Sequence, residues 1–187
     1  MQTMEPISGS LRNAVGAELV WQQTKLLKRM YELQSGDVLY ATMNWQSSWR
    51  SVAEVTAIDG HWTIRRSGFW RQRMVVTDNA TGAEIATFTP KWSGNGGTVS
   101  FSAERLFTLN RNSMWKGEWT WVTPQETPVL RIKNGWGSSR RARLIVEPEG
   151  ANIPETSILA TLGWYILIAA ADETAAVTAA SVAAVSG

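Results

Sequence analysis

The sequence contains no cysteine and a single histidine, His61. Without cysteine the chain has no disulfide, no thiolate metal site and no cysteine nucleophile, a composition typical of a reducing compartment. One histidine is too few for a metal site built on several imidazoles, and a Ser-His-Asp site would depend on it alone. Because His61 follows the turn Asp59-Gly60, a surface position in a hairpin is the ordinary interpretation. We therefore expect no catalytic residue, no bound metal and no cofactor.

Local patterns of secretion and nucleotide binding are also missing. The stretch from Met1 to Arg12 carries Glu5 and no apolar run, which argues against a secretory signal. We expect a cytoplasmic location, with peripheral association with a membrane as a variant of it. The run from Gly94 to Gly97 lacks the lysine and following helix of a P-loop. Glu147 and Glu149 flank a proline, where solvated acids are more usual than a catalytic pair of carboxylates.

The net charge of +2 conceals a basic central segment. Between Gly60 and Arg143 there are thirteen Lys or Arg residues and five acids, a difference of +8. Cations beside aromatic rings suit anionic lipid headgroups or stacked bases, whereas the alternative is a set of solvated surface charges. The candidate ligand-binding residues are Arg65, Arg66, Trp70, Arg71 and Arg73, with a second cluster at Arg140, Arg141 and Arg143.

Short runs of alternating apolar and polar residues, separated by turn residues, predict about twelve strands. Asp59-Gly60 and the stretch from Asp78 to Gly82 are the clearest hairpin turns. The alternation is cleanest where Trp119 and Trp121 share one face. The expected strands are 18–21, 25–33, 38–45, 52–58, 61–65, 72–77, 83–89, 98–101, 106–109, 115–122, 128–133 and 141–147. Many short strands at this spacing are typical of a sandwich or a barrel.

A helix is predicted after these strands. Asn152 is a candidate N-cap and Pro154 suits the first turn, and the fourteen residues from Ile158 to Ala171 are uncharged on every face. At about 1.5 Å per residue this run covers roughly 21 Å, less than the roughly 30 Å of a hydrocarbon layer. We therefore expect a core helix and no transmembrane span. A tail anchor running on through residues 174–187 is the alternative, which the carboxylates of Asp172 and Glu173 oppose.

These elements fit a closed barrel. Twelve strands about 4.8 Å apart and tilted near 40° would close a barrel roughly 24 Å across, and a helix about 10 to 12 Å wide would plug it. We predict a mainly β protein, a closed antiparallel barrel of about twelve strands around a buried hydrophobic C-terminal helix. The eleven Trp residues would line its core. The expected organisation is a flexible leader (1–17), a single barrel domain (18–173) with its helix at about 155–173, and a low-complexity tail (174–187) that is a helical extension, an interaction strand or disordered.

The order of these elements resembles the tubby C-terminal-like superfamily, which includes phospholipid scramblases and the plant LURP-one-related proteins. The resemblance rests on the hairpin from Val76 to Phe88, the strands around Trp119–Trp121 and Leu130–Ile132, and the helix from Ile158, and it spans roughly residues 18–173. It implies a twelve-stranded barrel around a hydrophobic helix, and association with membranes or phosphoinositides in the tubby branch. The cysteine-rich segment and calcium-loop pattern of the scramblase branch are missing from this sequence, so the resemblance does not extend to scrambling activity.

Three hypotheses about function follow. The first is a non-catalytic binding module that recognises anionic lipid headgroups or a protein partner at a basic barrel surface. The second is a nucleic-acid-binding module that uses the same arginines and tryptophans. The third is an enzyme or small-ligand carrier, which requires an open barrel with a vacant interior.

Overall fold

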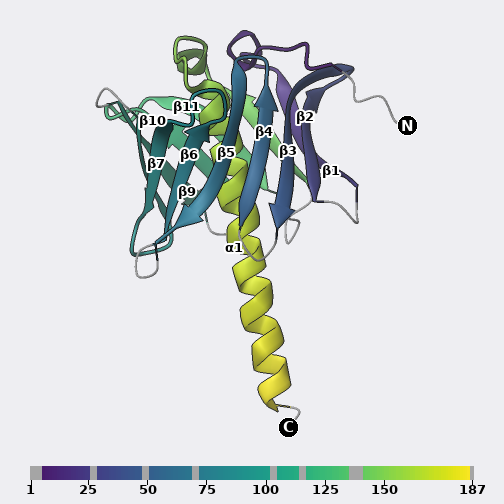
Figure 1. Ribbon diagram of the computed structural model, residues 1–187. Coiled ribbons are helices and arrows are strands. Elements are labelled where there is room, and N and C mark those ends of the chain that lie inside the picture. Colours follow the sequence, from purple (N-terminus) through teal and green to yellow (C-terminus); the bar gives the residue numbers. More distant parts are fainter. Residues whose placement is uncertain are drawn as a thin grey trace.

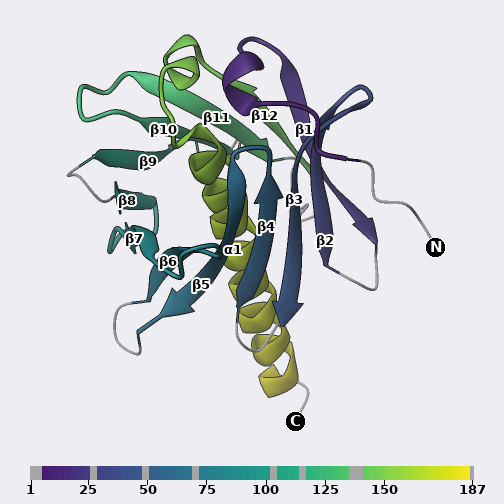
Figure 2. The ribbon, with the colours of Figure 1, turned by 45° about the horizontal axis from the view of Figure 1, so that its top comes forward.

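The computed structural model describes residues 6–25, 29–47, 51–68, 72–101, 105–113, 117–134 and 141–185. Within these residues twelve antiparallel strands form a closed barrel, in which sequence neighbours pair and β1 pairs with β12 (Figures 1 and 2). The strands are β1 (Glu18–Lys25), β2 (Met30–Ser35), β3 (Val38–Ser47), β4 (Val52–Ala57), β5 (Gly60–Ser67), β6 (Arg73–Asp78), β7 (Glu84–Pro90), β8 (Gly96–Phe101), β9 (Leu106–Ser113), β10 (Glu118–Val122), β11 (Pro128–Asn134) and β12 (Arg141–Val146). The predicted fold, a closed antiparallel barrel with a C-terminal helix in its core, is confirmed.

Alternation along each strand decides which side chains face the interior. In β4, Ala53 and Val55 are buried while Glu54 between them is exposed. Val55 lies opposite Trp62 of β5, which is also buried. Since successive side chains of a strand point to opposite faces, the inward halves of the twelve strands make one continuous apolar lining.

The helix α1 (Thr156–Val185) fills the space inside this lining (Figure 2). Every residue from Leu159 to Ala169 is buried, as expected for a helix without a polar face. Aromatic rings of the helix stack on rings of the wall, Trp164 on Trp21 with centroids 6.0 Å apart and Tyr165 on Trp45 with centroids 4.7 Å apart. The prediction of a core helix is therefore confirmed for the first half of α1.

The described residues before β1 pack on the barrel, in contrast to the flexible leader predicted for residues 1–17. The N–H groups of Ser8 and Gly9 donate to the carbonyl of Leu39 at 3.0 and 3.1 Å. The short helix η1 (Leu11–Asn13) buries Leu11, which is 1% exposed, and Ala14 after it is also buried. These residues join the domain because their apolar side chains complete the core at one end of the barrel.

The boundaries of the C-terminal helix differ from those predicted. Asn152 does not cap α1; it ends the short helix η2 (Pro148–Ala151), and its N–H donates to the Glu149 carbonyl. The helix starts at Thr156, whose hydroxyl donates to the Gly150 carbonyl at 2.6 Å. It continues past residue 173 to Val185, so the tail is a helical extension, one of the three alternatives considered above.

The tryptophans do not all line the core. Six of those in the described residues are buried or nearly so: Trp21, Trp45, Trp62, Trp119, Trp121 and Trp164. Trp92 is fully exposed, with a relative accessibility of 102%, because it lies in the connection between β7 and β8, beyond the strand pairing. The expectation is wrong for this residue, and Trp49, Trp70, Trp115 and Trp136 lie outside the described residues.

Gly163 marks a close approach of α1 to the barrel wall. A Cβ atom there would lie 2.8 Å from Trp121 Nε1 and 2.5 Å from Ile132 Cδ1. We expect Gly163→Val to lower the free energy of unfolding by about 1 to 3 kcal/mol, because overpacking displaces neighbouring side chains. Denaturant titration measures the change, and Ala175→Val on the exposed part of the same helix is the control. Equal stability of the two variants would contradict the tight contact.

Candidate functional site

The two ends of the barrel differ in what covers them. At one end η1 packs against η2 and against the start of α1. At the other end α1 leaves the barrel (Figure 1). We call this second end the exit end; it is formed by the last residues of the odd-numbered strands, Lys25, Ser47, Ser67, Pro90, Ser113 and Asn134. The opposite end is called the far end.

Beyond the exit end α1 carries no charge. Burial stops after Ala169, and the side chains from Thr174 to Ala179 are exposed, with Val177 at 67%. From Thr174 to Val185 the helix contains only Ala, Val, Thr and Ser. The hydroxyls of Thr174, Thr178 and Ser181 donate to carbonyls one turn earlier in the same helix, at 2.9 to 3.0 Å. From Thr174 to Ala179 the helix therefore presents methyl groups and internally bonded hydroxyls.

The two acids of α1 sit where it crosses the rim of the barrel, each paired with an arginine of the wall. Arg29 Nη2 donates to both carboxylate oxygens of Asp172, at 2.6 and 2.8 Å, and its guanidinium lies 5.1 Å from the Trp45 ring centroid. Burial alone would lower the pKa of Arg29, but the hydrogen bond and charge of Asp172 leave that pKa raised. Arg66 Nη1 lies 2.6 Å from Glu173 Oε1. The acids that opposed a membrane-facing tail are therefore neutralised at the rim.

Charge is divided between the two ends of the barrel. Among the described residues, the far end carries the acids Asp37, Asp59, Asp78, Glu126 and Glu149. Two described cations lie there, the exposed Arg12 of η1 and Arg105, which is paired with Glu155. The exit end has exposed Arg73, Lys91 and Arg141, while the charges of its two rim arginines are balanced by Asp172 and Glu173. An anionic surface would therefore meet the exit end more favourably than the far end.

The structure separates the arginines predicted to act together. Arg65 and Arg66 point to opposite faces of β5: Arg65 pairs with Glu84 on the outer surface at 3.2 Å, while Arg66 reaches inward to Glu173. Arg73 is exposed at the start of β6, and Arg141 and Arg143 are exposed on β12, on another side of the barrel. Arg143 faces Glu18 at 3.5 Å. Trp70, Arg71 and Arg140 lie outside the described residues.

The six connections that follow the odd-numbered strands share a composition rich in cations and tryptophan. The described connection, from Lys91 to Asn95, holds a cation and the exposed Trp92. The five others fall outside the described residues; each contains Lys or Arg, four contain Trp, and none contains an acid: residues 26–28, 48–50, 69–71, 114–116 and 135–140. This pattern is not among the sequence predictions, which place Trp70 in a basic cluster and otherwise expect the tryptophans in the core. In the sequence, the signal is one Trp in each of five connections that follow odd-numbered strands, that is, in every second connection along the chain.

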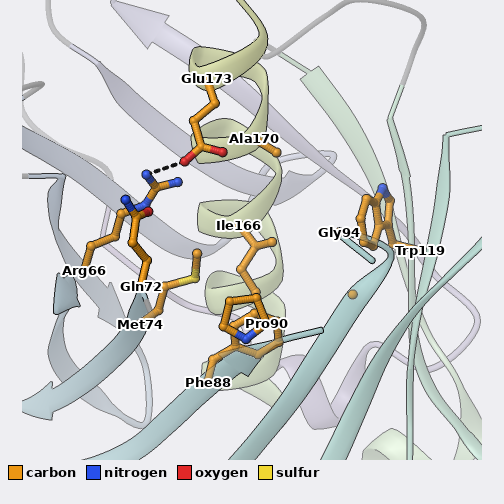
Figure 3. Close-up of a pocket in the computed structure, with 11 residues that line it drawn as sticks. Arg66, Gln72, Met74, Phe88, Pro90, Gly94, Trp119, Ile166, Ala170 and Glu173 are labelled. Carbon is orange, nitrogen blue, oxygen red and sulfur yellow. Dashed lines mark ion pairs between the residues drawn. The ribbon is translucent and has the colours of Figure 1, made fainter. Parts of the chain in front are cut away.

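A pocket of about 170 Å³ opens beside α1 at the exit end (Figure 3). Its apolar lining comes from β6, β7, β10 and α1, through Met74, Phe88, Trp119 and Ile166. The ion pair of Arg66 with Glu173 lies at one side of the pocket (Figure 3). No local sequence pattern predicts this space, because it depends on the distance between the barrel wall and the helix.

Groups suited to catalysis or metal binding are not gathered in the described part of the chain. His61 is exposed, with Nδ1 3.1 Å from Thr56 Oγ1, and no cluster of three potential ligands occurs among the described residues. Burial raises the pKa of Tyr165, whose hydroxyl donates to the Ser51 carbonyl, so this phenol stays protonated. The segment Thr156–Ala179 is long and apolar enough to cross a bilayer, but 61% of its most apolar window is buried inside the protein.

No protein-family model, curated protein or solved structure matches this chain. The resemblance to the tubby-like superfamily therefore remains a prediction from the sequence, and the candidate site is argued from its own geometry.

The ion pair of Arg29 and Asp172, in which Nη2 donates to both carboxylate oxygens, should stabilise the position of α1 at the rim. We expect a double-mutant cycle with Arg29→Gln and Asp172→Asn to give a coupling free energy of about 1 kcal/mol, because charge-assisted, half-buried pairs exceed exposed ones. The cycle with Arg143→Gln and Glu18→Gln is the control; that pair is 65% and 55% exposed and 3.5 Å apart, and its coupling should be near zero. Equal couplings would contradict a special role for the rim pair.

Proposed function

We propose that this chain is a non-catalytic binding module that docks the exit end of its barrel on an anionic lipid surface. The observation that carries the proposal is the exposed half of α1, an uncharged segment that leaves the protein through a basic rim. The described side chains from Thr174 to Ala179 include exposed alanines and Val177, which water solvates poorly. A lipid surface offers both an apolar phase for the helix and negative charge for the rim.

The described length of the segment suits insertion into one face of a lipid layer. From Thr174 to Val185 the helix rises about 18 Å at roughly 1.5 Å per residue, whereas the hydrocarbon layer is about 30 Å thick. Asp172 and Glu173, paired at the rim, would lie at headgroup level and avoid the cost of charge in hydrocarbon. The hydroxyls of the segment are already bonded within the helix, which reduces their desolvation cost.

The rest of the exit end suits the boundary between water and lipid. Trp92 is fully exposed there, and tryptophan is enriched at membrane interfaces because its ring is apolar and its N–H is polar. Lys91 is its neighbour, and Arg73 is exposed at the start of β6. Anionic headgroups attract cations at this level, and each cation contributes about 1 kcal/mol to the free energy of membrane binding.

The other hypotheses fit these observations less well. An enzyme or carrier with an open barrel would need a vacant interior, and in the described residues α1 fills it. Nucleic acid could meet the basic rim but would leave the uncharged helix without a role. A protein partner, including a second copy of the chain, could cover the helix without any need for anionic lipid. Pelleting with vesicles separates these cases.

Replacing Val177 tests the role of the helix. We expect Val177→Asp to weaken pelleting with anionic vesicles at least about tenfold, since an aspartate costs on the order of 2.5 kcal/mol at the bilayer centre and less near its surface. Ile58→Asp is the matched control, because Ile58 is 53% exposed at the far end and should not touch lipid. Equal binding by both variants would contradict the insertion of α1 into lipid. Absence of pelleting by the unmodified protein would contradict the proposed function.

Neutralising the rim tests the charge component. We expect Arg73→Gln and Lys91→Gln each to reduce affinity for anionic vesicles about fivefold at low salt and less at physiological salt, since surface attraction is screened. Binding to neutral vesicles should not change. Arg12→Gln, an exposed cation in η1 at the far end, is the control. A loss of binding that is the same for all three variants would show that only net charge matters.

A further inference from the structure

The pocket beside α1 persists because the residues at its rim are small. On the wall side lie Gly94 and Gly96, and on the helix side Ala170. A Cβ on Gly96 would collide with the Leu109 carbonyl oxygen, 1.8 Å away, and Gly96 has φ of +122°, so a side chain cannot fill the space from this position. The close approach of Gly96, the first residue of β8, to Leu109 of β9 therefore excludes a side chain at this point of the pocket rim.

Its inner surface is mainly apolar. Met74, Phe88, Trp119 and Ile166 are each no more than 9% exposed, and their side chains face the pocket. A volume of about 170 Å³ is of the same order as an engineered cavity of about 150 Å³ that binds benzene, a ligand of six carbons. The pocket therefore has room for roughly six carbons of an alkyl chain.

Its polar edge carries an incompletely bonded arginine. Arg66 Nη1 is paired with Glu173 Oε1, but Arg66 Nε is buried and has no hydrogen-bond partner. The Arg66 side chain is 19% exposed and that of Glu173 is 58% exposed, so the carboxylate can swing into solvent while the guanidinium stays. An arginine fork can bind two oxygens of one carboxylate or phosphate. Gln72, whose side chain lies beside Arg66, offers a further amide donor (Figure 3).

We propose that this pocket binds the alkyl chain of an anionic amphiphile, whose carboxylate or phosphate replaces Glu173 on Arg66. The chain would lie against Met74, Phe88 and Ile166, and the head group would sit at the exit end. The inference rests on the proposed function in one respect, that the exit end faces lipid, from which such a molecule would enter. A free fatty acid and a phospholipid share the chemistry of an acyl chain next to an anion.

The test uses the full chain in solution, without vesicles. Sodium octanoate and a monomeric octanoyl lysophosphatidate represent the two sources, with octanol and inorganic phosphate as probes of chain and charge alone. Binding is followed by calorimetry and by the fluorescence change of the protein's tryptophans, since Trp119 lines the pocket. We expect at least one of the two anionic amphiphiles to bind at least tenfold more tightly than octanol, with no measurable binding of phosphate. The tighter of the two identifies the source. If neither amphiphile binds, or if octanol binds equally well, the inference is wrong.

Variants assign the effect to the ion pair. Arg66→Gln should weaken binding of the amphiphile at least tenfold, while Glu173→Gln, which removes the competing carboxylate, should strengthen it severalfold. A purely structural role of the pair would make both variants weaken binding. Arg131→Gln is the matched control, because Arg131 forms a 2.6 Å pair with Glu147 outside the pocket. Unchanged binding in Arg66→Gln, or weaker binding in Glu173→Gln, overturns the assignment.

The two proposals fail separately. Val177→Asp lies outside the pocket and should keep its affinity for the soluble amphiphile while it loses vesicle binding. If the unmodified protein binds the amphiphile but does not pellet with vesicles, the proposed function fails and the pocket stands. If it pellets but binds neither amphiphile, the pocket inference fails and the lipid-docking proposal stands.

Discussion

The burial of an uncharged helix is the constraint on which the rest of this structure depends. The first half of α1 has no polar face to turn toward water, so a wall must enclose it on all sides. A closed twelve-stranded barrel supplies that wall and leaves no strand edge unpaired. The shell between helix and wall is then filled by large rings, among them Trp21, Trp164 and Tyr165, while Gly163 allows one close contact with Trp121.

Much of the fold could be predicted from two patterns in the sequence. Alternation of apolar and polar residues predicts the strands, and an apolar run without a polar stripe predicts the buried helix. The site could not be predicted in the same way. Arg65 and Arg66 are adjacent in sequence and were grouped together, yet the pleat sends one outward and the other to the helix. Pairing of Asp172 with Arg29, 143 residues earlier, depends on where the rim lies, which no local pattern reveals. Trp92 was assigned to the core by residue type, whereas its position in a hairpin connection was the better guide.

The helix α1 lies in two environments, the protein core and the exterior, and it passes from one to the other at the rim of the barrel. Before the rim α1 is the centre of a protein core; beyond it the same kind of side chain is exposed. Asp172 and Glu173 stand at that boundary and are held by wall arginines, so the transition is accompanied by charge neutralisation. The pocket lies at the same boundary, where the wall stands away from the helix at Gly96 and Ala170. The features that support a function are therefore concentrated at one end of an otherwise closed molecule.

The pairing of β1 with β12 also bears on the order of folding. Glu18 lies opposite Ile145, so the seam of the barrel joins residues more than a hundred positions apart, and it cannot form until β12 has been synthesised. The helix α1, which fills the interior, follows β12 in the chain. Its large side chains, such as that of Trp164, could not enter a barrel that had already closed. During synthesis the strands would therefore form an open, curved sheet with an exposed apolar face. This face would be covered only when α1 has been synthesised and β1 pairs with β12. Nascent chains of this protein would be most aggregation-prone after β12 has left the ribosome and before α1 has done so.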